Sequence, residues 1–351
     1  MHTSTRGSGC REIAVTQNPA PPAEQAPSAG QAQQARAAEV QGLEIVARTQ
    51  GQLVRRRFFR HRGALAGITG LLFIVILAFS SIGVGAVPGW WDKSPTATGA
   101  KIEDGRPSLD LAPSFVDGDG LSWGEHPFGQ DDIGVDYFAK TMRGAQQSLV
   151  IALIVGLAAT TIGTTVGALA GYFRGWLESL LMRLTDLVIT IPVLVIAAVL
   201  GRTVGNQGII ALALVLALVM WTSLARLIRG EFLSLREKEF VEAARALGAS
   251  SRRIIFRHIL PNTVGIIVVG ATLLTAQAIL LEAALSFLGL GVRPPDTSLG
   301  LLISEYQSAF ATRPWLFWWP GLFIVAIALC VNFIGDGLRD AFDPRQGRVR
   351  S

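Results

Sequence analysis

The sequence predicts an all-α membrane protein with six transmembrane helices and both termini in the cytoplasm. Of its 351 residues, 50% are hydrophobic and only 16% are charged, whereas a soluble domain usually carries charge on about a quarter of its residues. The apolar residues also gather in long uncharged runs, which a soluble core does not require. The net charge of +5 comes from arginines that flank these runs, which favours anchoring at the cytoplasmic membrane face over nucleic-acid binding.

Residues 1–41 predict a disordered cytoplasmic tail, because they are rich in Ala, Gln, Pro, Ser and Gly and have no apolar periodic face. They also lack the apolar stretch of a signal peptide. Residues 42–62 predict a basic interfacial segment, since a group of arginines directly precedes the first apolar run. These arginines are Arg55, Arg56, Arg57, Arg60 and Arg62.

Six uncharged runs predict the transmembrane helices, because a helix needs about 20 apolar residues to cross the hydrocarbon core. The runs cover residues 63–91, 144–173, 187–201, 203–225, 259–281 and 314–335. The third run reaches this length only if it extends back to Leu180, which places Arg183 and Asp186 at its inner end. Pro192 lies inside the third run and predicts a kink there.

The second and sixth runs carry residues that predict packing contacts. Small residues at intervals of four let helices approach closely, so we expect a packing face in the second run at Gly163, Gly167 and Gly171. At the inner end of the sixth run we expect ion pairs, drawn from Asp336, Arg339, Asp340, Asp343 and Arg345.

The charges of the loops predict the orientation. Segment 226–258 has eight Arg or Lys against four Asp or Glu, whereas segment 92–140 has ten Asp or Glu against four Arg or Lys. Because Lys and Arg are retained on the cytoplasmic side, the first segment is expected inside and the second outside. The predicted parts after the first helix are an acidic extracytoplasmic loop 92–143, a core of helices two to six over 144–335 with an inner loop 226–262, and a cytoplasmic tail 336–351.

No source of energy for transport is visible within the chain. No Gly-Lys pair occurs, so the phosphate-binding loop of an ATPase is absent from the sequence. The runs are almost free of charge, and the exceptions, Asp186 and Glu282, lie near run ends, whereas ion-coupled carriers usually place such groups mid-span. The two cysteines and four histidines lie singly, which predicts no metal site, catalytic residue or cofactor on this chain. An ion-driven carrier and a non-transporting scaffold stay as alternatives.

Residues 238–262 of the inner loop, KEFVEAARALGASSRRIIFRHILPN, predict a helical elbow. The first half is rich in alanine and charge and favours a helix, in which Glu242 and Arg245 are spaced to pair. Gly248 is typical of a helix end, Ser250 or Ser251 of the next helix start, and Pro261 is expected to close the second helix. A rigid elbow joined to two spans could act as a lever, and an ordinary interfacial loop is the alternative.

This stretch resembles the coupling loop of bacterial binding-protein-dependent ABC importers, whose pattern is Glu-Ala-Ala, three residues, Gly, nine residues and Ile-x-Leu-Pro. The matching positions are Glu242, Ala243, Ala244, Gly248, Leu260 and Pro261. His258 stands where the general pattern has Ile, as in the variant of peptide permeases. The resemblance implies that this loop docks into a groove of the ATPase subunit, with Arg245, Ala249 and His258 close to the contact.

Further segments are similar to the second, C-type permease subunit of dipeptide, oligopeptide and nickel importers. They lie at residues 55–68, 126–149, 182–192, 280–291 and 332–345, in the family's order. Within the second segment, HPFGQDDIGVDYFAKTMRGAQQSL, the sequence departs from the family pattern at Gln130, Val135 and Gln146. Together the segments cover roughly residues 50–346.

The resemblance implies a type I importer permease in a bacterial inner membrane. It implies a second permease subunit as heterodimer partner, two ATPase subunits that hold ATP and magnesium, and an extracytoplasmic binding protein that delivers di- or oligopeptides, with nickel or another small solute as the alternative cargo. The chain itself would catalyse no reaction. Because the family motif carries a glutamate at Glu282, we expect a structural hydrogen bond there and keep a substrate contact as the alternative.

Overall fold

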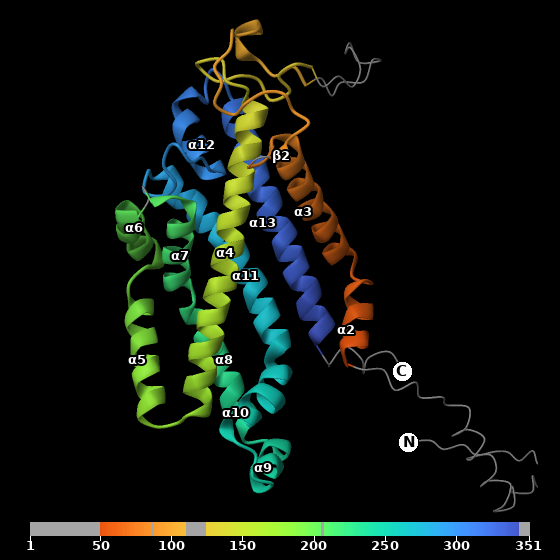
Figure 1. Ribbon diagram of the computed structural model, residues 1–351, viewed down its shortest axis with the longest axis vertical. Helices are drawn as coiled ribbons and strands as arrows, with labels where there is room; N and C mark the ends of the chain where they lie inside the picture. Colours follow the sequence, from red (N-terminus) through yellow and green to blue (C-terminus); the bar gives the residue numbers. More distant parts are fainter. Residues whose placement is uncertain (1–49, 86, 110–123, 205–206, 344–351) are drawn as a thin grey trace, which may run out of the picture. The chain divides into compact units, whose positions relative to one another are not determined.

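Helices account for nearly all of the secondary structure in the computed structural model of the chain (Figure 1). The structure describes residues 50–85, 87–109, 124–204 and 207–343, which belong to one contact unit beginning at Gln50. The predicted disordered tail 1–41, the first part of the interfacial segment, the middle of the outer loop and Arg345 lie outside the described residues.

The described helices range in length from the 4 residues of α10 to the 36 residues of α4. They are α2 (Gln50–Phe58), α3 (Arg62–Ser81), β1 (Gly83–Val84), β2 (Val87–Pro88), the 3-10 turn η1 (Glu103–Gly105), α4 (Tyr137–Tyr172), α5 (Trp176–Thr190), α6 (Val193–Val204), α7 (Ile209–Met220), α8 (Thr222–Arg236), α9 (Glu239–Ala246), α10 (Ser251–Ile254), the π turn η4 (Ile255–Ile259), α11 (Leu260–Phe287), α12 (Leu299–Tyr306), the 3-10 turn η5 (Gln307–Ala309) and α13 (Trp315–Phe342). The two short strands pair antiparallel. Between β2 and α4, the described residues of the outer loop are mostly irregular apart from the turn η1.

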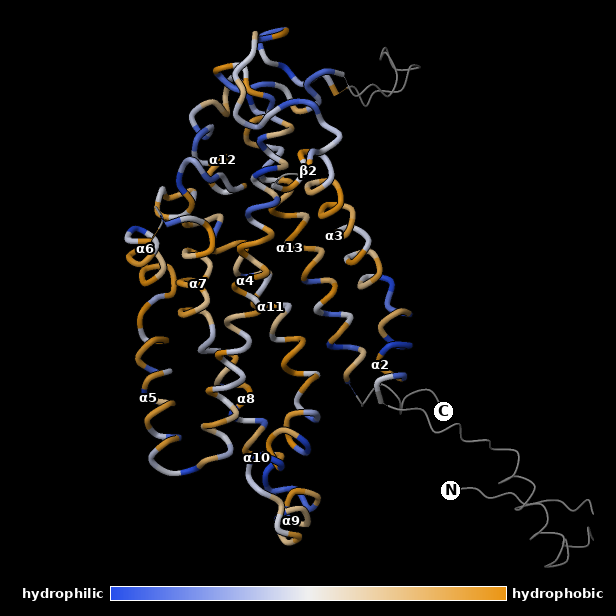
Figure 2. Tube along the Cα trace, in the orientation of Figure 1, coloured by the Kyte–Doolittle hydropathy of each residue, from blue (hydrophilic) through white to orange (hydrophobic). Residues whose placement is uncertain are grey.

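Four of the described helices are long and apolar enough to cross a membrane: α3, α4, the continuous helix Ser251–Phe287 and α13. Two further spans are formed if each bent helix pair, α5 with α6 and α7 with α8, is counted as one. The predicted number of six is the upper figure of this range. Figure 2 shows apolar residues along these helices and hydrophilic residues concentrated at their two ends.

The third predicted helix is broken rather than kinked. α5 and α6 meet at Pro192 with a bend of 85°. Ile191, which precedes the proline, has an extended backbone with φ of −88° and ψ of 130°, because the proline ring disfavours the helical conformation of the preceding residue. Near the middle of α5, Asp186 pairs with Arg226 of α8 at 2.5 Å, so the acidic residue within the predicted run has a cationic partner.

Other predicted helix limits are wrong as well. The first helix, α3, ends at Ser81 rather than at residue 91, and the chain then turns back through the paired strands β1 and β2. The second helix begins at Tyr137 rather than at residue 144, because Asp136 accepts a hydrogen bond from the Ala139 backbone N–H and caps the helix in the outer loop. The fourth helix begins at Ile209 rather than at 203, and it bends by 45° between Met220 and Thr222. Uncharged composition marks where a helix is apolar, but the capping side chains decide where it starts.

The glycines of α4 bring its backbone against α8. A Cβ added at Gly163 would lie 2.8 Å from the Trp221 carbonyl oxygen, and one added at Gly167 would lie 2.5 Å from that of Ala225. At Gly171 an added Cβ would lie 2.5 Å from Phe232 Cβ. These separations are too short for real atoms, so the packing face predicted from the four-residue spacing is confirmed.

The segment before α3 contacts the inner end of α13. Asp340 Oδ2 lies 3.4 Å from His61 Nε2, and the Arg57 guanidinium donates to the Asp343 backbone carbonyl at 2.9 Å. Asp336 and Arg339 are exposed and form no ion pair with any described residue. Residues three or four apart can face each other along a helix, but Asp340 pairs with His61, which lies between α2 and α3.

Replacing Gly167 with alanine is expected to destabilise the protein. The added methyl group would press on the Ala225 carbonyl of the facing helix, and overpacking of this kind costs about 1–3 kcal/mol. The control is Gly230→Ala in α8, where nothing lies within 4 Å of the added Cβ, so stability should stay equal or rise. Thermal unfolding of the two variants in detergent measures the difference; equal midpoints would contradict the close packing of α4 on α8.

Candidate functional site

The inner loop folds as an elbow, residues 239–259, between α8 and α11 (Figure 1). At the end of α9 the Gly248 N–H donates to the Arg245 carbonyl, and the Ala249 N–H donates to the Ala244 carbonyl, each at 3.0 Å. Gly248 has φ of +79°, a left-handed conformation that glycine adopts without the steric cost of a Cβ. Gly248 therefore ends α9, as the sequence predicted.

The second arm of the elbow runs into the membrane helix without interruption. Ser250 caps α10 by accepting a hydrogen bond from the Arg253 N–H. The helix continues through the π turn η4, in which the Leu260 N–H donates to the Ile255 carbonyl, and then into α11. The prediction that Pro261 closes this helix is wrong. The wider π turn directly before the proline accommodates its ring and its missing N–H, and the Asn262 side chain donates to the His258 carbonyl at 2.6 Å.

One face of the elbow is anchored in the protein interior. Val241 of α9 is fully buried, and Ile254, Ile255 and Ile259 belong to the same core cluster, together with residues of α4, α7 and α8. Burial of such aliphatic side chains contributes about 1.5–3 kcal/mol each. The elbow is therefore fixed to the body of the subunit and is not a loosely attached loop.

The opposite face of the elbow exposes large apolar side chains beside charged ones. Leu247 is 89% exposed, Phe256 61% and Phe240 42%. A shallow hollow of about 390 Å³ lies next to Phe256, lined also by Ser250, Arg252 and Arg253. An apolar surface rimmed by charges is typical of a protein interaction site.

The predicted coupling residues lie on this elbow with different exposures. Glu242, Ala243, Arg245, Gly248 and Pro261 are exposed, Ala249, His258 and Leu260 are half-buried, and Ala244 is buried against the core. The ion pair considered for Glu242 and Arg245 is not formed between these two described side chains, so both remain available on the surface. Leu247, the most exposed large apolar residue of the elbow, was not among the predicted residues; its place directly before the helix-ending glycine was the available signal.

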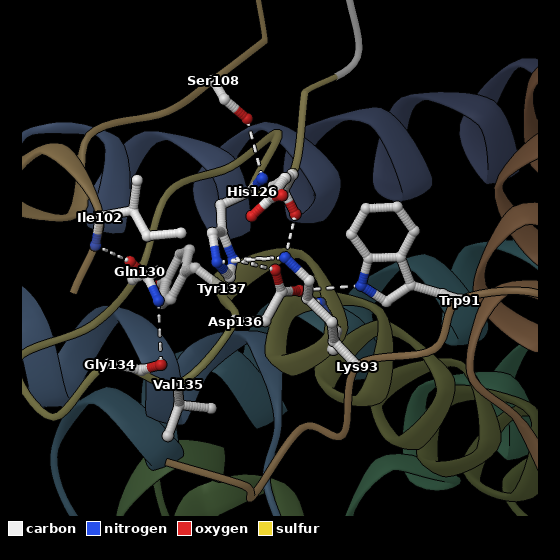
Figure 3. A network of polar contacts seen from close by, with 12 residues as sticks. Trp91, Lys93, Ile102, Ser108, His126, Gln130, Gly134, Val135, Asp136 and Tyr137 are labelled. Atoms are coloured by element: carbon white, nitrogen blue, oxygen red, sulfur yellow. Dashed lines mark hydrogen bonds and ion pairs between the residues drawn. The ribbon is translucent and has the colours of Figure 1, made fainter. Parts of the chain in front are cut away.

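At the other end of the bundle, the described part of the outer loop forms a cap over α4 (Figure 3). Asp136 is its centre: Oδ1 accepts hydrogen bonds from Trp91 Nε1–H at 3.0 Å and from the Ala139 N–H at 2.8 Å. Oδ2 lies 2.6 Å from His126 Nδ1. Lys93 Nζ lies 3.1 Å from the other ring nitrogen of His126 and also donates to the Glu125 carbonyl. Six polar groups thus converge where helix α4 begins.

Gln130 closes a second part of the cap. Its Oε1 accepts a hydrogen bond from the Ile102 N–H at 2.8 Å, and its Nε2 donates to the Ala100 and Gly134 carbonyls at 3.1 Å each. A threonine, the residue of the family pattern, has a single hydroxyl on Cβ and could not supply a terminal amide to these three groups. Val135, the second departure, is buried in the cap. The departures therefore have structural partners in this chain.

Three consecutive polar residues of α4 connect the cap to the rest of the bundle. Gln146, the third departure, donates to the carbonyl of Ala78 in the last turn of α3 and to that of Gly83 just after α3. Gln147 donates to Asp296 at 2.9 Å and accepts from the Thr297 N–H at 2.6 Å. Ser148 joins α4 to α11 and α12, as described next. We refer to these three residues, Gln146, Gln147 and Ser148, as the α4 polar step.

Glu282 of α11 is buried and hydrogen-bonded. Ser148 Oγ donates to its Oε2 at 3.1 Å and Ser286 Oγ donates to its Oε1 at 2.7 Å. Ser148 Oγ also accepts from the Leu299 N–H at the start of α12. The structural hydrogen bond expected for Glu282 is present, and the carboxylate faces serines of its own subunit.

α12 is fastened to the cap by a buried tyrosine. Tyr306 donates to Asp131 Oδ2 at 3.1 Å, and Lys140 of α4 lies 3.5 Å from the same carboxylate and 3.3 Å from that of Glu305. Burial, together with the negative charge of Asp131, raises the pKa of Tyr306 above its ordinary value. The hydroxyl thus stays a hydrogen-bond donor. Neither Tyr306 nor Lys140 was predicted, since no local motif marks them.

Comparison with known proteins shows which membrane proteins the chain is similar to. Residues 163–348 match the family described as binding-protein-dependent transport system inner membrane component, and residues 49–86 match the N-terminal TM domain of oligopeptide transport permease C. The oligopeptide transport system permease protein OppC of Mycobacterium tuberculosis is 39% identical over 299 residues, which cover 85% of this chain and 96% of the relative. The corresponding protein of Salmonella typhimurium is 39% identical over 303 residues, with coverages of 86% and 94%.

Among solved structures, an inward-facing methionine ABC transporter aligns with 57% of this chain and 95% of its own, at 20% identity and a TM-score of 0.48. The sequence relatives confirm the resemblance carried by the motifs. The match covers both the first helix and the segment from Gly163 onward, which includes the elbow. The chain belongs to the family of inner membrane components of binding-protein-dependent transport systems.

Proposed function

We propose that the chain is one permease subunit of an ABC importer that moves di- or oligopeptides inward, driven by separate ATPase subunits that dock on the elbow. The observation that carries the proposal is the two-sided construction of the elbow. Val241 and Ile254 anchor it in the core, whereas Leu247 and Phe256 are left exposed beside Gly248. A surface that is apolar, rigid and unpartnered within its own chain fits a docking contact with another subunit.

The elbow is continuous with a long helix, which supports its use as a lever. α10, η4 and α11 form one helix of 37 residues, Ser251–Phe287, which corresponds to about 55 Å at 1.5 Å per residue. Its outer end carries Glu282, bonded to Ser148 of α4. Movement of the elbow by an ATPase subunit would therefore reach the outer end of α4 and the cap through covalent and hydrogen-bonded contacts.

Residues of the elbow then have distinct roles. Glu242, Ala243, Arg245 and Gly248 are proposed to contact the ATPase subunit directly, since they are exposed. Ala244 and Leu260 face the subunit's own body, and half-buried His258 is proposed to pack at the edge of the contact. ATP and magnesium would be held by the ATPase subunits, so this chain would catalyse no reaction and carry no cofactor.

The remaining partners are proposed from family membership and from helices whose apolar side chains are exposed. α5 and α6 expose large apolar side chains, among them Trp176, Leu187 and Val199, and Thr185 is the one buried residue described on α5. This apolar surface is proposed to meet the second permease subunit as well as lipid. On the outside, the cap is proposed to receive the binding protein. The relatives are named for oligopeptide transport, which supports a peptide cargo.

The overall proposal is tested by reconstituting the complete complex in proteoliposomes with its binding protein. Peptide uptake should require ATP and the ATPase subunits, and should persist when an ionophore dissipates the proton gradient. Uptake that survives removal of ATP but stops with the ionophore would instead support an ion-driven carrier. Nickel in place of peptide as the transported solute would contradict the cargo assignment alone.

Gly248→Val is expected to abolish coupling. Valine in a left-handed conformation costs about 1–2 kcal/mol, and its branched side chain would project where the ATPase subunit docks. Binding-protein-stimulated ATP hydrolysis and uptake should fall at least tenfold, the effect of about 1.4 kcal/mol at the contact.

The matched control for this variant is Gly289→Val at the opposite end of the lever. Gly289 has φ of +73° and, like Gly248, has no atom within 4 Å of an added Cβ. Both variants suffer the same backbone strain, but only the elbow variant should lose ATPase subunits during purification. Equal losses in both would show that strain, rather than docking, is responsible.

Leu247→Ala is expected to weaken binding of the ATPase subunits without destabilising the permease. The side chain is exposed in the free subunit, so truncation removes little folding energy, whereas a central apolar contact at an interface is worth about 2 kcal/mol, or thirtyfold in affinity. Leu227→Ala in α8, also exposed, serves as the control. Titration of ATPase subunits onto the reconstituted permease measures the affinities; an unchanged value for Leu247→Ala would remove this residue from the contact.

A further inference from the structure

The basic segment before the first membrane helix is folded and fixed in place. The chain leaves helical geometry at His61, whose φ of −82° and ψ of 105° and whose ring, accepting the Ala64 N–H, cap the start of α3. α2 is therefore a separate helix. It packs against α13, where the Arg57 guanidinium donates to the Asp343 carbonyl at 2.9 Å.

Arg57 is the exception among the arginines of this segment. The other four, Arg55, Arg56, Arg60 and Arg62, are exposed, and their side chains form no hydrogen bond or ion pair with any described residue. Residues 50–62 contain no Asp or Glu. The Arg57 guanidinium thus holds α2 in place, and the other four positive charges are exposed.

Apolar side chains are exposed within the same segment. Leu53 is 39% exposed and Phe59 is 58% exposed. A short helix with exposed aromatic and aliphatic groups beside arginines is suited to the boundary between headgroups and acyl chains. The covalent link to α3 keeps this segment at the end of a membrane helix, so the charges meet the headgroup layer without further cost of association.

We propose that α2 and the turn after it form a binding surface for anionic phospholipid headgroups of the inner leaflet. The planar guanidinium groups of Arg55 and Arg56 would pair with phosphodiester oxygens, which they match in bidentate geometry. Leu53 and Phe59 would enter the adjoining apolar layer. Because α2 is fastened to α13, bound lipid would also fix the inner end of α13.

The test measures lipid binding to the full-length chain in detergent by native mass spectrometry. The protein is titrated with phosphatidylglycerol, and separately with zwitterionic phosphatidylcholine of the same acyl chains. The test variant is Arg55→Gln/Arg56→Gln, and the charge-preserving variant is Arg55→Lys/Arg56→Lys. The matched control is Lys101→Gln/Arg106→Gln, which removes two exposed positive charges of the outer loop.

Wild type should bind phosphatidylglycerol more tightly than phosphatidylcholine. The glutamine pair at 55 and 56 should weaken binding at the tightest phosphatidylglycerol site about 25-fold, from about fivefold for each arginine. The lysine pair should stay within about threefold of wild type, the outer-loop control should be unchanged, and millimolar inorganic phosphate should not displace the lipid.

Three results would overturn the proposal. One is equal affinity of wild type and the glutamine pair for phosphatidylglycerol. Another is an equal loss in the outer-loop control, which would indicate a general effect of net charge. The third concerns the glutamine pair in the complete complex. If this variant keeps its affinity for phosphatidylglycerol but loses the ATPase subunits, the arginines belong to a protein contact.

Discussion

A polar side chain within an apolar layer must find all of its partners inside the protein, because lipid offers none. The α4 polar step meets this requirement in a way that organises the outer half of the subunit. Gln146 takes up carbonyls at the end of α3, Gln147 binds the segment before α12, and Ser148 bonds to Glu282 of α11. Three neighbouring residues on one helix thus hold three other parts of the chain, and each bond excludes an alternative packing that would leave a polar group unsatisfied.

The inner half of the bundle follows a different principle. There α4 presents glycines instead of polar groups, and its backbone approaches α8 closely enough to exclude any Cβ at Gly167. Dispersion and close approach hold this contact. One helix therefore carries both forms of attachment, polar at its outer end and small-residue packing at its inner end, and it connects the cap with the helices that enter and leave the elbow.

The elbow depends on a local solution to the helix-breaking effect of proline. Without the π turn η4, Pro261 would interrupt the helix at the membrane surface, and the two arms of the elbow would be separated from α11. With the wider turn, Ser251–Phe287 is one helix. The second arm of the elbow, which carries Phe256, and the buried Glu282 are therefore parts of one continuous helix, and a movement of this arm would be transmitted along it.

The sequence by itself determined the membrane class, the apolar runs, the elbow with its helix end at Gly248, and the glycine face of α4, since each depends on composition or on spacing within one helix. The family resemblance was likewise carried by local motifs. The break at Pro192 and the start of α4 at Asp136 have local causes as well, although only the structure showed their extent. Tertiary structure decided the partners of Gln130 and Gln146, the inward position of Arg57 and the attachment of Tyr306. These features join residues far apart in the chain, and a hydrogen bond across such a distance leaves no periodic signal in the sequence. The residue type showed which hydrogen bonds a side chain could form, whereas the packing of the helices decided which partner it bonds.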